Sequence, residues 1–179
     1  MIRSLDGITP LIHPSAFVSE FAYVVGDVEI GEDSSIWPGT VIRADSGKIA
    51  IGSQTCIQDN SVVHGDADVV IGDRVVIGHR VVCHARSVGA GVMIGNGAVV
   101  NDGVEIGEGS LVASAAMVVE NMIIPPRSMV VGVPARIRGP VEERHSRLIE
   151  ARAESYVRKA ERYKIQGVLE AERDQWPVS

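Results

Sequence analysis

A branched aliphatic residue returns at every sixth position through most of the chain, and a small or turn-forming residue follows it closely. The pattern begins clearly at Ile30, Ile36 and Ile42. The same phase returns at Ile51, Ile57, Val63, Ile71, Ile77, Cys83, Val88, Ile94, Val100, Ile106, Val112 and Val118. A strand inside so short a unit cannot bury a core alone, so the units must stack on one another.

Three such units per turn predict a triangular parallel β-helix, a mainly β fold whose interior is built from ladders of Ile and Val. The second position on one face is repeatedly glycine: Gly31, Gly52, Gly72, Gly89 and Gly107. Because only glycine takes strained corner dihedrals without steric cost, we expect these residues to provide the conformation of one corner.

The repeat ends near residue 137, where Pro134, Gly139 and Pro140 interrupt the pattern. From Val141 to Gln166, apolar residues follow at spacings of four and three: Ile149, Ala153, Tyr156, Ala160 and Tyr163. This single stripe predicts a C-terminal α-helix packed along one face of the β-helix, ended by Gly167. We therefore expect a β-helix domain over residues 1–138 and a C-terminal helix and tail over residues 139–179.

Composition narrows the classes of partner. No apolar run in the 179 residues approaches the ~20 that a membrane span needs, and the segment from Met1 to Asp6 lacks a signal-peptide apolar stretch, which predicts a cytoplasmic protein without membrane contact. A net charge of −6 argues against nucleic acid as a partner. Both cysteines, Cys56 and Cys83, fall in strand positions and are predicted to be buried thiols.

Three polar residues recur at the second position of another face. When small insertions at the corners are allowed for, Arg43, His64 and His84 form a vertical column with neighbours about 4.8 Å apart. Two imidazoles one strand apart suit a metal, because Zn–N bonds of about 2.0 to 2.1 Å let nitrogens roughly 3.2 Å apart converge. Imidazole also accepts iron and cobalt, so the ligand type leaves Zn²⁺, Fe²⁺ and Co²⁺ open.

Further polar residues lie on the preceding face. Gln58 occupies the second position there, while Asp59 and His79 share the third position on successive turns. His79 lies around a corner from His84 and is expected to point away from it within one chain. A neighbouring copy related by a threefold axis would bring its own His79 toward His64, which predicts a homotrimer with a metal site at each interface. The alternative is a pair of surface histidines that happen to stack.

These residues resemble the γ-class carbonic anhydrases. The resemblance rests on Val41-Ile42-Arg43-Ala44-Asp45, on Ile57-Gln58-Asp59-Asn60-Ser61-Val62-Val63-His64, and on Ile77-Gly78-His79 followed by His84. It extends from about Ile8 to Arg138. It implies a left-handed β-helix, a trimer, and a zinc or ferrous site that hydrates CO₂ reversibly to bicarbonate through a metal-bound hydroxide.

The resemblance also implies a role for each site residue. His64 and His84 would be metal ligands from one subunit, and His79 would be the ligand from the next. Arg43 would lie near the subunit boundary and pair with an acid such as Asp59.

Three more residues gain roles from the same resemblance. Asp45 would hold a similar structural contact, and Gln58 would orient the metal-bound hydroxide. Many family members carry an Asn-Tyr pair in the C-terminal helix that reaches the site, and Ser155-Tyr156 stands in the matching place.

The chain departs from the family at the positions where the proton shuttle is expected. Ser46 and Ala67 occupy places where the family's archetype carries glutamates, and Asp66 and Asp68 flank the second place. The chain also has Ala85-Arg86 where a Gly-Cys pair commonly follows the last ligand. A missing shuttle slows proton transfer, so we expect intact metal binding with low turnover.

Three functions remain open at this point. The first is a metal-dependent carbonic anhydrase. The second is a binding or scaffold protein that keeps the metal site without catalysis, which Ser46 and Ala67 favour. The third is a hexapeptide-repeat acyltransferase, which shares the fold but needs only one histidine as a general base, so a set of three convergent ligands argues against it.

Overall fold

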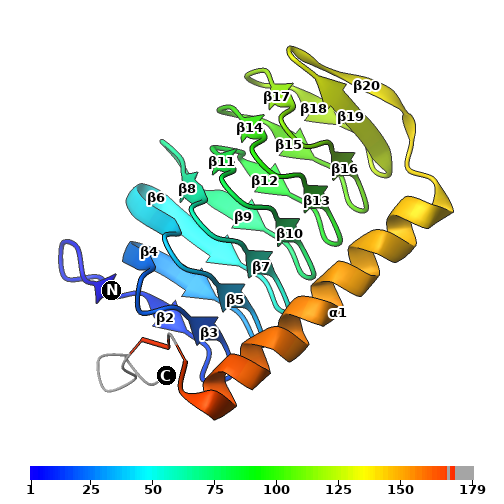
Figure 1. Cartoon of the computed structure of the whole chain (residues 1–179). Helices are drawn as coiled ribbons and strands as arrows, with labels where there is room; N and C mark the ends of the chain where they lie inside the picture. Colours follow the sequence, from blue (N-terminus) through cyan, green and yellow to red (C-terminus); the bar gives the residue numbers. More distant parts are fainter. Residues whose placement is uncertain (169, 172–179) are drawn as a thin grey trace.

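The strands stack into a triangular solenoid with one helix beside it (Figure 1). The structure is a computed structural model, and it describes residues 1–168 and 170–171. The solenoid is a left-handed parallel β-helix of about 7 turns with a single C-terminal helix. The predicted fold class is therefore confirmed.

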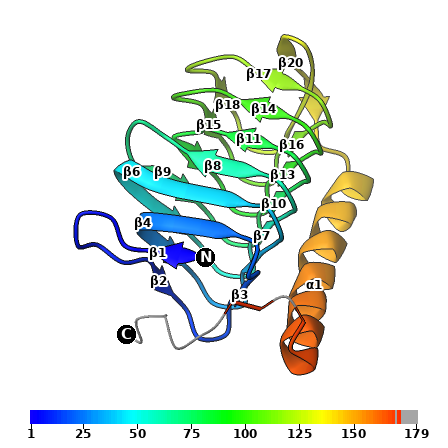
Figure 2. The same cartoon turned by 60° about the vertical axis from the view of Figure 1, so that its left-hand side comes forward.

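Two of the three faces belong to one sheet, because β4 (Tyr23–Ile30) and β6 (Val41–Ile51) run without a break across the corner between them. The first face, at the front of Figure 2, also contains β1 (Ile2–Arg3), β8 (Val62–His64), β11 (Val82–Cys83), β14 (Val99–Val100) and β17 (Met117–Val118). The second face also contains β2 (Leu11–Ile12), β9 (Val69–Ile71), β12 (Ser87–Val88), β15 (Glu105–Ile106) and β18 (Ile123–Ile124).

The third face is a separate sheet. It contains β3 (Phe17–Val18), β5 (Ser35–Ile36), β7 (Cys56–Ile57), β10 (Val76–Ile77), β13 (Met93–Ile94), β16 (Leu111–Val112), β19 (Ser128–Gly132) and β20 (Ala135–Pro140). All pairings in this sheet are parallel except the one between β19 and β20, which form an antiparallel hairpin. This hairpin closes the last turn of the solenoid.

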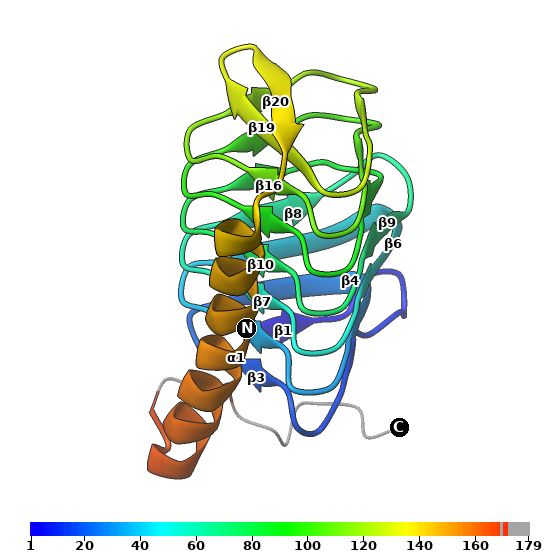
Figure 3. The ribbon, with the colours of Figure 1, turned by 90° about the vertical axis from the view of Figure 1, so that its right-hand side faces the viewer.

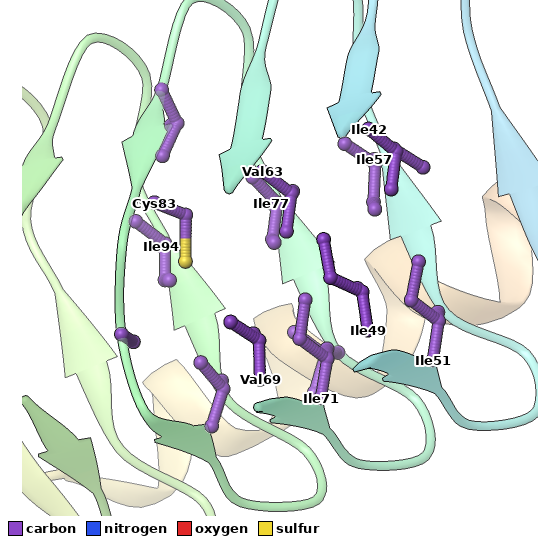
Figure 4. Close-up of a cluster of buried hydrophobic side chains, with 14 of the residues drawn as sticks. Ile42, Ile49, Ile51, Ile57, Val63, Val69, Ile71, Ile77, Cys83 and Ile94 are labelled. Carbon is purple, nitrogen blue, oxygen red and sulfur yellow. The ribbon is translucent and has the colours of Figure 1, made fainter. Parts of the chain in front are cut away.

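Ladders of identical or similar apolar residues fill the interior, as the repeat predicts (Figure 4). Ile57, Ile77 and Ile94 occupy the same position on successive strands of the third face. All three are fully buried. Since each side chain packs on its equivalents in the turns on either side, the register of the repeat is fixed by the core itself.

The recurring corner glycines serve close packing, and the prediction that they provide a strained conformation is wrong. Gly31, Gly52, Gly72, Gly89 and Gly107 are absent from the residues with positive φ. A Cβ added at Gly107 would lie 2.4 Å from the Pro126 nitrogen, and one added at Gly89 would lie 2.6 Å from the Glu108 nitrogen. The next turn therefore passes too close for any side chain.

The C-terminal helix α1 (Glu143–Gln166) covers the third face and runs antiparallel to the growth of the solenoid (Figure 3). Its buried residues are Ile149, Ala153, Tyr156 and Ala160, which confirms the predicted stripe. It ends at Gly167, whose φ of 60° lies in the left-handed region. Beyond it the chain returns to the first turns, where the Ala171 amide donates to the Val18 carbonyl at 2.8 Å.

No helix in the part of the chain that the structure describes combines the length and the apolar character that a membrane crossing requires.

Candidate metal centre

The strand register brings Arg43, His64 and His84 into one column on the outer surface of the first face. Arg43 in β6 pairs directly with His64 in β8. Val63 pairs with Cys83, so the next residues along, His64 and His84, are also neighbours. These outward positions alternate with the inward core residues, because successive side chains of a strand point to opposite faces.

The two imidazoles of this column face each other. Nδ1 of His64 lies 3.4 Å from Nε2 of His84, and the ring centroids are 4.9 Å apart. His64 is 6% exposed, whereas the His84 side chain is 27% exposed. The facing nitrogens are therefore held together at the edge of a buried region.

The outer nitrogen of His64 contacts a carboxylate. Nε2 of His64 lies 2.9 Å from Oδ1 of Asp45, and the other oxygen of Asp45 pairs with Arg43. The hydrogen bond with His64, together with the Arg43 charge, holds the pKa of Asp45 below its usual range. In the neutral tautomer that donates from Nε2 to an ionised Asp45, the lone pair of Nδ1 is directed at His84.

The outer nitrogen of His84 has an equivalent partner that the sequence analysis missed. Nδ1 of His84 lies 3.1 Å from Oδ1 of Asp102. Asp102 stands one turn further along and next to Asn101, which continues the column of histidines. The sequence contains a signal for this contact, because an acidic residue directly beside the histidine column lies within reach of His84.

His79 lies apart from this pair. Its Nδ1 is 3.0 Å from Oδ2 of Asp59, and its backbone amide donates to Asn96. Among the residues that the structure describes, no three His, Cys, Asp or Glu side chains of one chain converge as a metal site. Within one chain, Asp59 pairs with His79. Arg43 pairs with Asp45, whereas the resemblance led us to expect a pairing with an acid such as Asp59. Arg43 and Asp45 are two positions apart on one strand and thus project from the same side.

Gln58 and Tyr156 lie near the third face. Gln58 is 5% exposed, and its side-chain amide has no hydrogen-bond partner in the described part of the chain. Tyr156 of α1 packs edge-on against Trp37, with ring centroids 5.4 Å apart. Burial, with smaller contributions from Cys56 and Asp59, raises the pKa of Tyr156 to about 12. Tyr156 lies within a packed cluster that includes Phe17, Trp37 and Cys56.

A cavity of about 690 Å³ opens beside His84. Most of the residues that line it are acidic or have small side chains. The lining residues are Ser46, Gly65, Asp66, Ala67, Asp68, Val69, His84, Arg86, Asp102 and Gly103. The one arginine among them pairs with Glu105 at 3.3 Å, so the cavity has a negative character.

Known proteins resemble this chain in sequence and in fold. Residues 9–44 match the model of the bacterial transferase hexapeptide family (six repeats). A carbonic anhydrase from Geobacillus kaustophilus (strain HTA426) is 48% identical over 64 residues, which cover 36% of this chain and 35% of that protein. Gamma carbonic anhydrase 2, mitochondrial, from Arabidopsis thaliana is 52% identical over 56 residues, which cover 31% of this chain and 20% of that protein. The chain thus spans well under half the length of either curated relative.

The similarity to a solved structure is more extensive. The crystal structure of a hexapeptide transferase family protein from Anaplasma phagocytophilum matches with a TM-score of 0.87 and 34% sequence identity. The match covers 90% of this chain and 97% of that chain.

Proposed function

This chain belongs to the hexapeptide transferase family, and from that premise we propose that it is a γ-type carbonic anhydrase-like metalloenzyme with low turnover. Its reaction would be the reversible hydration of CO₂ to bicarbonate. One metal ion would be held at each interface of a homotrimer by His64, by His84 and by the partner subunit's His79. Zn²⁺ suits this set, and Fe²⁺ or Co²⁺ are alternatives.

The observation that carries the proposal is the pair of imidazole nitrogens 3.4 Å apart. With Asp45 and Asp102 taking the protons on the outer nitrogens, both inner nitrogens present lone pairs to one point. Two lone pairs this close repel each other, and either a shared proton or a metal cation between them removes that repulsion. Tetrahedral ligation with Zn–N bonds of about 2.0 to 2.1 Å places two nitrogens about 3.3 Å apart, so the residues fit the ion.

A bound Zn²⁺ would act as a Lewis acid and lower the pKa of a coordinated water to about 7. The protein residues would do the remaining work. Asp45 and Asp102 would fix the histidine tautomers, and Arg43 would hold Asp45 in place. Gln58, buried and without a hydrogen-bond partner in the described part of the chain, has an amide available to orient the reacting oxygen. CO₂ is small enough to reach such a site without a dedicated binding residue.

An exposed apolar ladder on the first face supports the trimer. Outward-facing apolar residues pair from strand to strand beside the histidine column. They are Tyr23, Val41, Val62, Val82, Val99 and Met117. Val82 remains 38% exposed and Tyr23 36% exposed in the single chain. Contiguous apolar surface beside an incomplete ligand set is the kind of surface that a second copy would cover.

The name of the structural relative, a hexapeptide transferase family protein, keeps the acyltransferase considered above as the third candidate. The cavity beside His84 argues against it, because Asp66, Asp68 and Asp102 would repel the phosphates of an acyl-CoA. A scaffold role without catalysis is the second candidate, and the absence of glutamates at Ser46 and Ala67 favours it. The predicted cytoplasmic location stays a prediction.

Metal content per subunit tests the proposal. The protein would be purified without oxygen or chelator and measured by elemental mass spectrometry, with His84→Ala as the ligand variant. His13→Ala is the matched control, since His13 is an exposed histidine that bonds Ser15 far from the column. We expect about one zinc or iron per chain in the wild type and in the control, and none in His84→Ala. No metal in the wild type after incubation with zinc would refute the proposal.

A mixing experiment tests whether the site is shared between subunits. His64→Ala and His79→Ala subunits would be refolded or co-expressed together. Mixed trimers contain some interfaces with all three ligands, so metal binding and CO₂ hydration should partly return. Absence of recovery would refute the intersubunit site. Metal binding with no detectable CO₂ hydration in the wild type would favour the scaffold role.

A further inference from the structure

The two facing histidines are held by their carboxylates with unequal strength. Asp45, which contacts His64, is itself held by Arg43, and the His64 side chain is only 8% exposed. Asp102, which contacts His84, has a side chain that is 53% exposed and makes no other contact through it in the described part of the chain. Apart from its contact with His64, the His84 ring is held by one exposed carboxylate, whereas His64 is also fixed by burial.

The orientation of His84 decides whether the pair can converge. The second side-chain torsion of histidine has broad, roughly two-fold minima, so packing alone fixes it weakly when the ring is partly exposed. The contact between Nδ1 and Asp102 at 3.1 Å selects the ring orientation in which Nε2 faces His64. It also places the proton of the neutral ring on Nδ1 and leaves the lone pair on Nε2.

From this geometry we propose that Asp102 is a positioning residue for metal binding, which acts through His84 by fixing both its ring orientation and its tautomer. The inference rests on the proposed function, because it concerns the same metal centre. It deepens that function by making the ring orientation of His84, and with it the metal affinity, depend on a residue of the next turn that would not touch the ion.

A solvated surface acid that lies beside a histidine by chance is the competing explanation. Exposed ion pairs contribute only about 0 to 1 kcal/mol to folding, so Asp102 would then have little effect on anything. A positioning carboxylate differs, because its loss typically weakens metal binding about 10- to 100-fold. The two explanations therefore predict different metal affinities.

The chain offers a closely matched control. Glu120 occupies the position equivalent to Asp102 one turn further along, as the pairing of Val100 with Val118 shows. It is exposed and lies at the same corner of the solenoid. Glu120→Ala removes the same charge from the same corner without touching His84, so it separates the specific contact from the general loss of negative charge.

The experiment measures the affinity of the full-length protein for Zn²⁺ and Co²⁺ by competition with a chelator. It compares wild type, Asp102→Ala, Asp102→Asn and Glu120→Ala, and records the visible spectrum of the Co²⁺ forms. We expect Asp102→Ala to bind about 10- to 100-fold more weakly, with an altered Co²⁺ spectrum. Asp102→Asn should lie between, because its amide oxygen still accepts a hydrogen bond from Nδ1. Glu120→Ala should match the wild type, and the melting temperatures of the metal-free proteins should agree.

The outcomes separate this inference from the proposed function. Equal affinity and equal Co²⁺ spectra in Asp102→Ala and wild type would overturn the positioning role and leave the metal site standing. An equal loss in Glu120→Ala would also overturn it, because the effect would then report net charge. A wild type that binds neither metal would overturn both.

Discussion

Replacement of Gly107 by alanine should strain the solenoid, because the next turn lies directly over this glycine. The added Cβ would lie 2.4 Å from the Pro126 nitrogen and 2.7 Å from the Pro125 carbonyl carbon. Both are backbone atoms, so no side-chain rotation relieves the contact. Ordinary van der Waals contact begins at 3.4 Å, and the two turns would therefore have to separate locally by about 1 Å.

That separation has a cost that can be estimated from the structure. The Gly107 amide donates to the Ile124 carbonyl at 2.8 Å across the same two turns. A shift of about 1 Å would take this bond beyond hydrogen-bonding range, which costs about 0.5 to 1.5 kcal/mol. Overpacking of a closely packed site costs about 1 to 3 kcal/mol more. We expect a total loss of about 1.5 to 4.5 kcal/mol in the free energy of unfolding.

Gly139→Ala is the matched control, because a Cβ added there meets nothing within 4 Å and its φ lies outside the left-handed region. This variant should be neutral or slightly more stable. Both variants would be unfolded in denaturant at equal protein concentration and followed by circular dichroism. Equal stability of Gly107→Ala and Gly139→Ala would refute the explanation that close packing requires these glycines.

Two further predictions concern the aromatic cluster under α1. Trp37→Ala removes ring contacts with Phe17 and Tyr163, both at centroid distances of 5.1 Å. The variant should lose about 3 to 5 kcal/mol in the free energy of unfolding and show faster amide hydrogen exchange in α1. Unchanged protection of α1 against exchange would contradict this prediction. Tyr156 keeps its proton in the folded state up to pH of about 12, against an ordinary value of 10, so stability should fall as pH rises through that window. Near-ultraviolet titration of tyrosinate checks this, since Tyr156→Phe should remove the late step, and a wild type without that step would contradict it.

The fold could be predicted because the period of the repeat determines which residues of successive turns lie side by side. Once Ile57 and Ile77 are known to stack, every residue between them is placed on a face, and His64 and His84 follow as neighbours. The helix could be predicted for the same reason, since its apolar stripe has one period and a glycine at its end. The sequence does not reveal the role of the corner glycines, because it shows where glycine recurs but not whether dihedral freedom or close approach of the next turn requires it.

The contacts of charged side chains were harder to predict than the register. Arg43 can reach acids on its own strand and on neighbouring turns, and sequence alone does not rank them. Its pairing with Asp45 depends on the conformation of β6 as it crosses the corner. The contact of Asp102 with His84 runs diagonally from one turn to the next, and such contacts escape an alignment that compares only equivalent positions.

Two of the departures from the γ-class pattern lie together in the cavity beside His84. Ser46 and Ala67, which stand where the family's archetype carries glutamates, line the same cavity as His84. Both positions therefore face the candidate metal centre, and small side chains there leave the cavity open. Asp68 is committed to the Lys48 amide at 2.9 Å, whereas Asp66 makes no hydrogen bond within the described residues. A proton leaving the site would thus depend on Asp66 or on bases from solution, which is the physical reason to expect slow turnover together with intact metal binding.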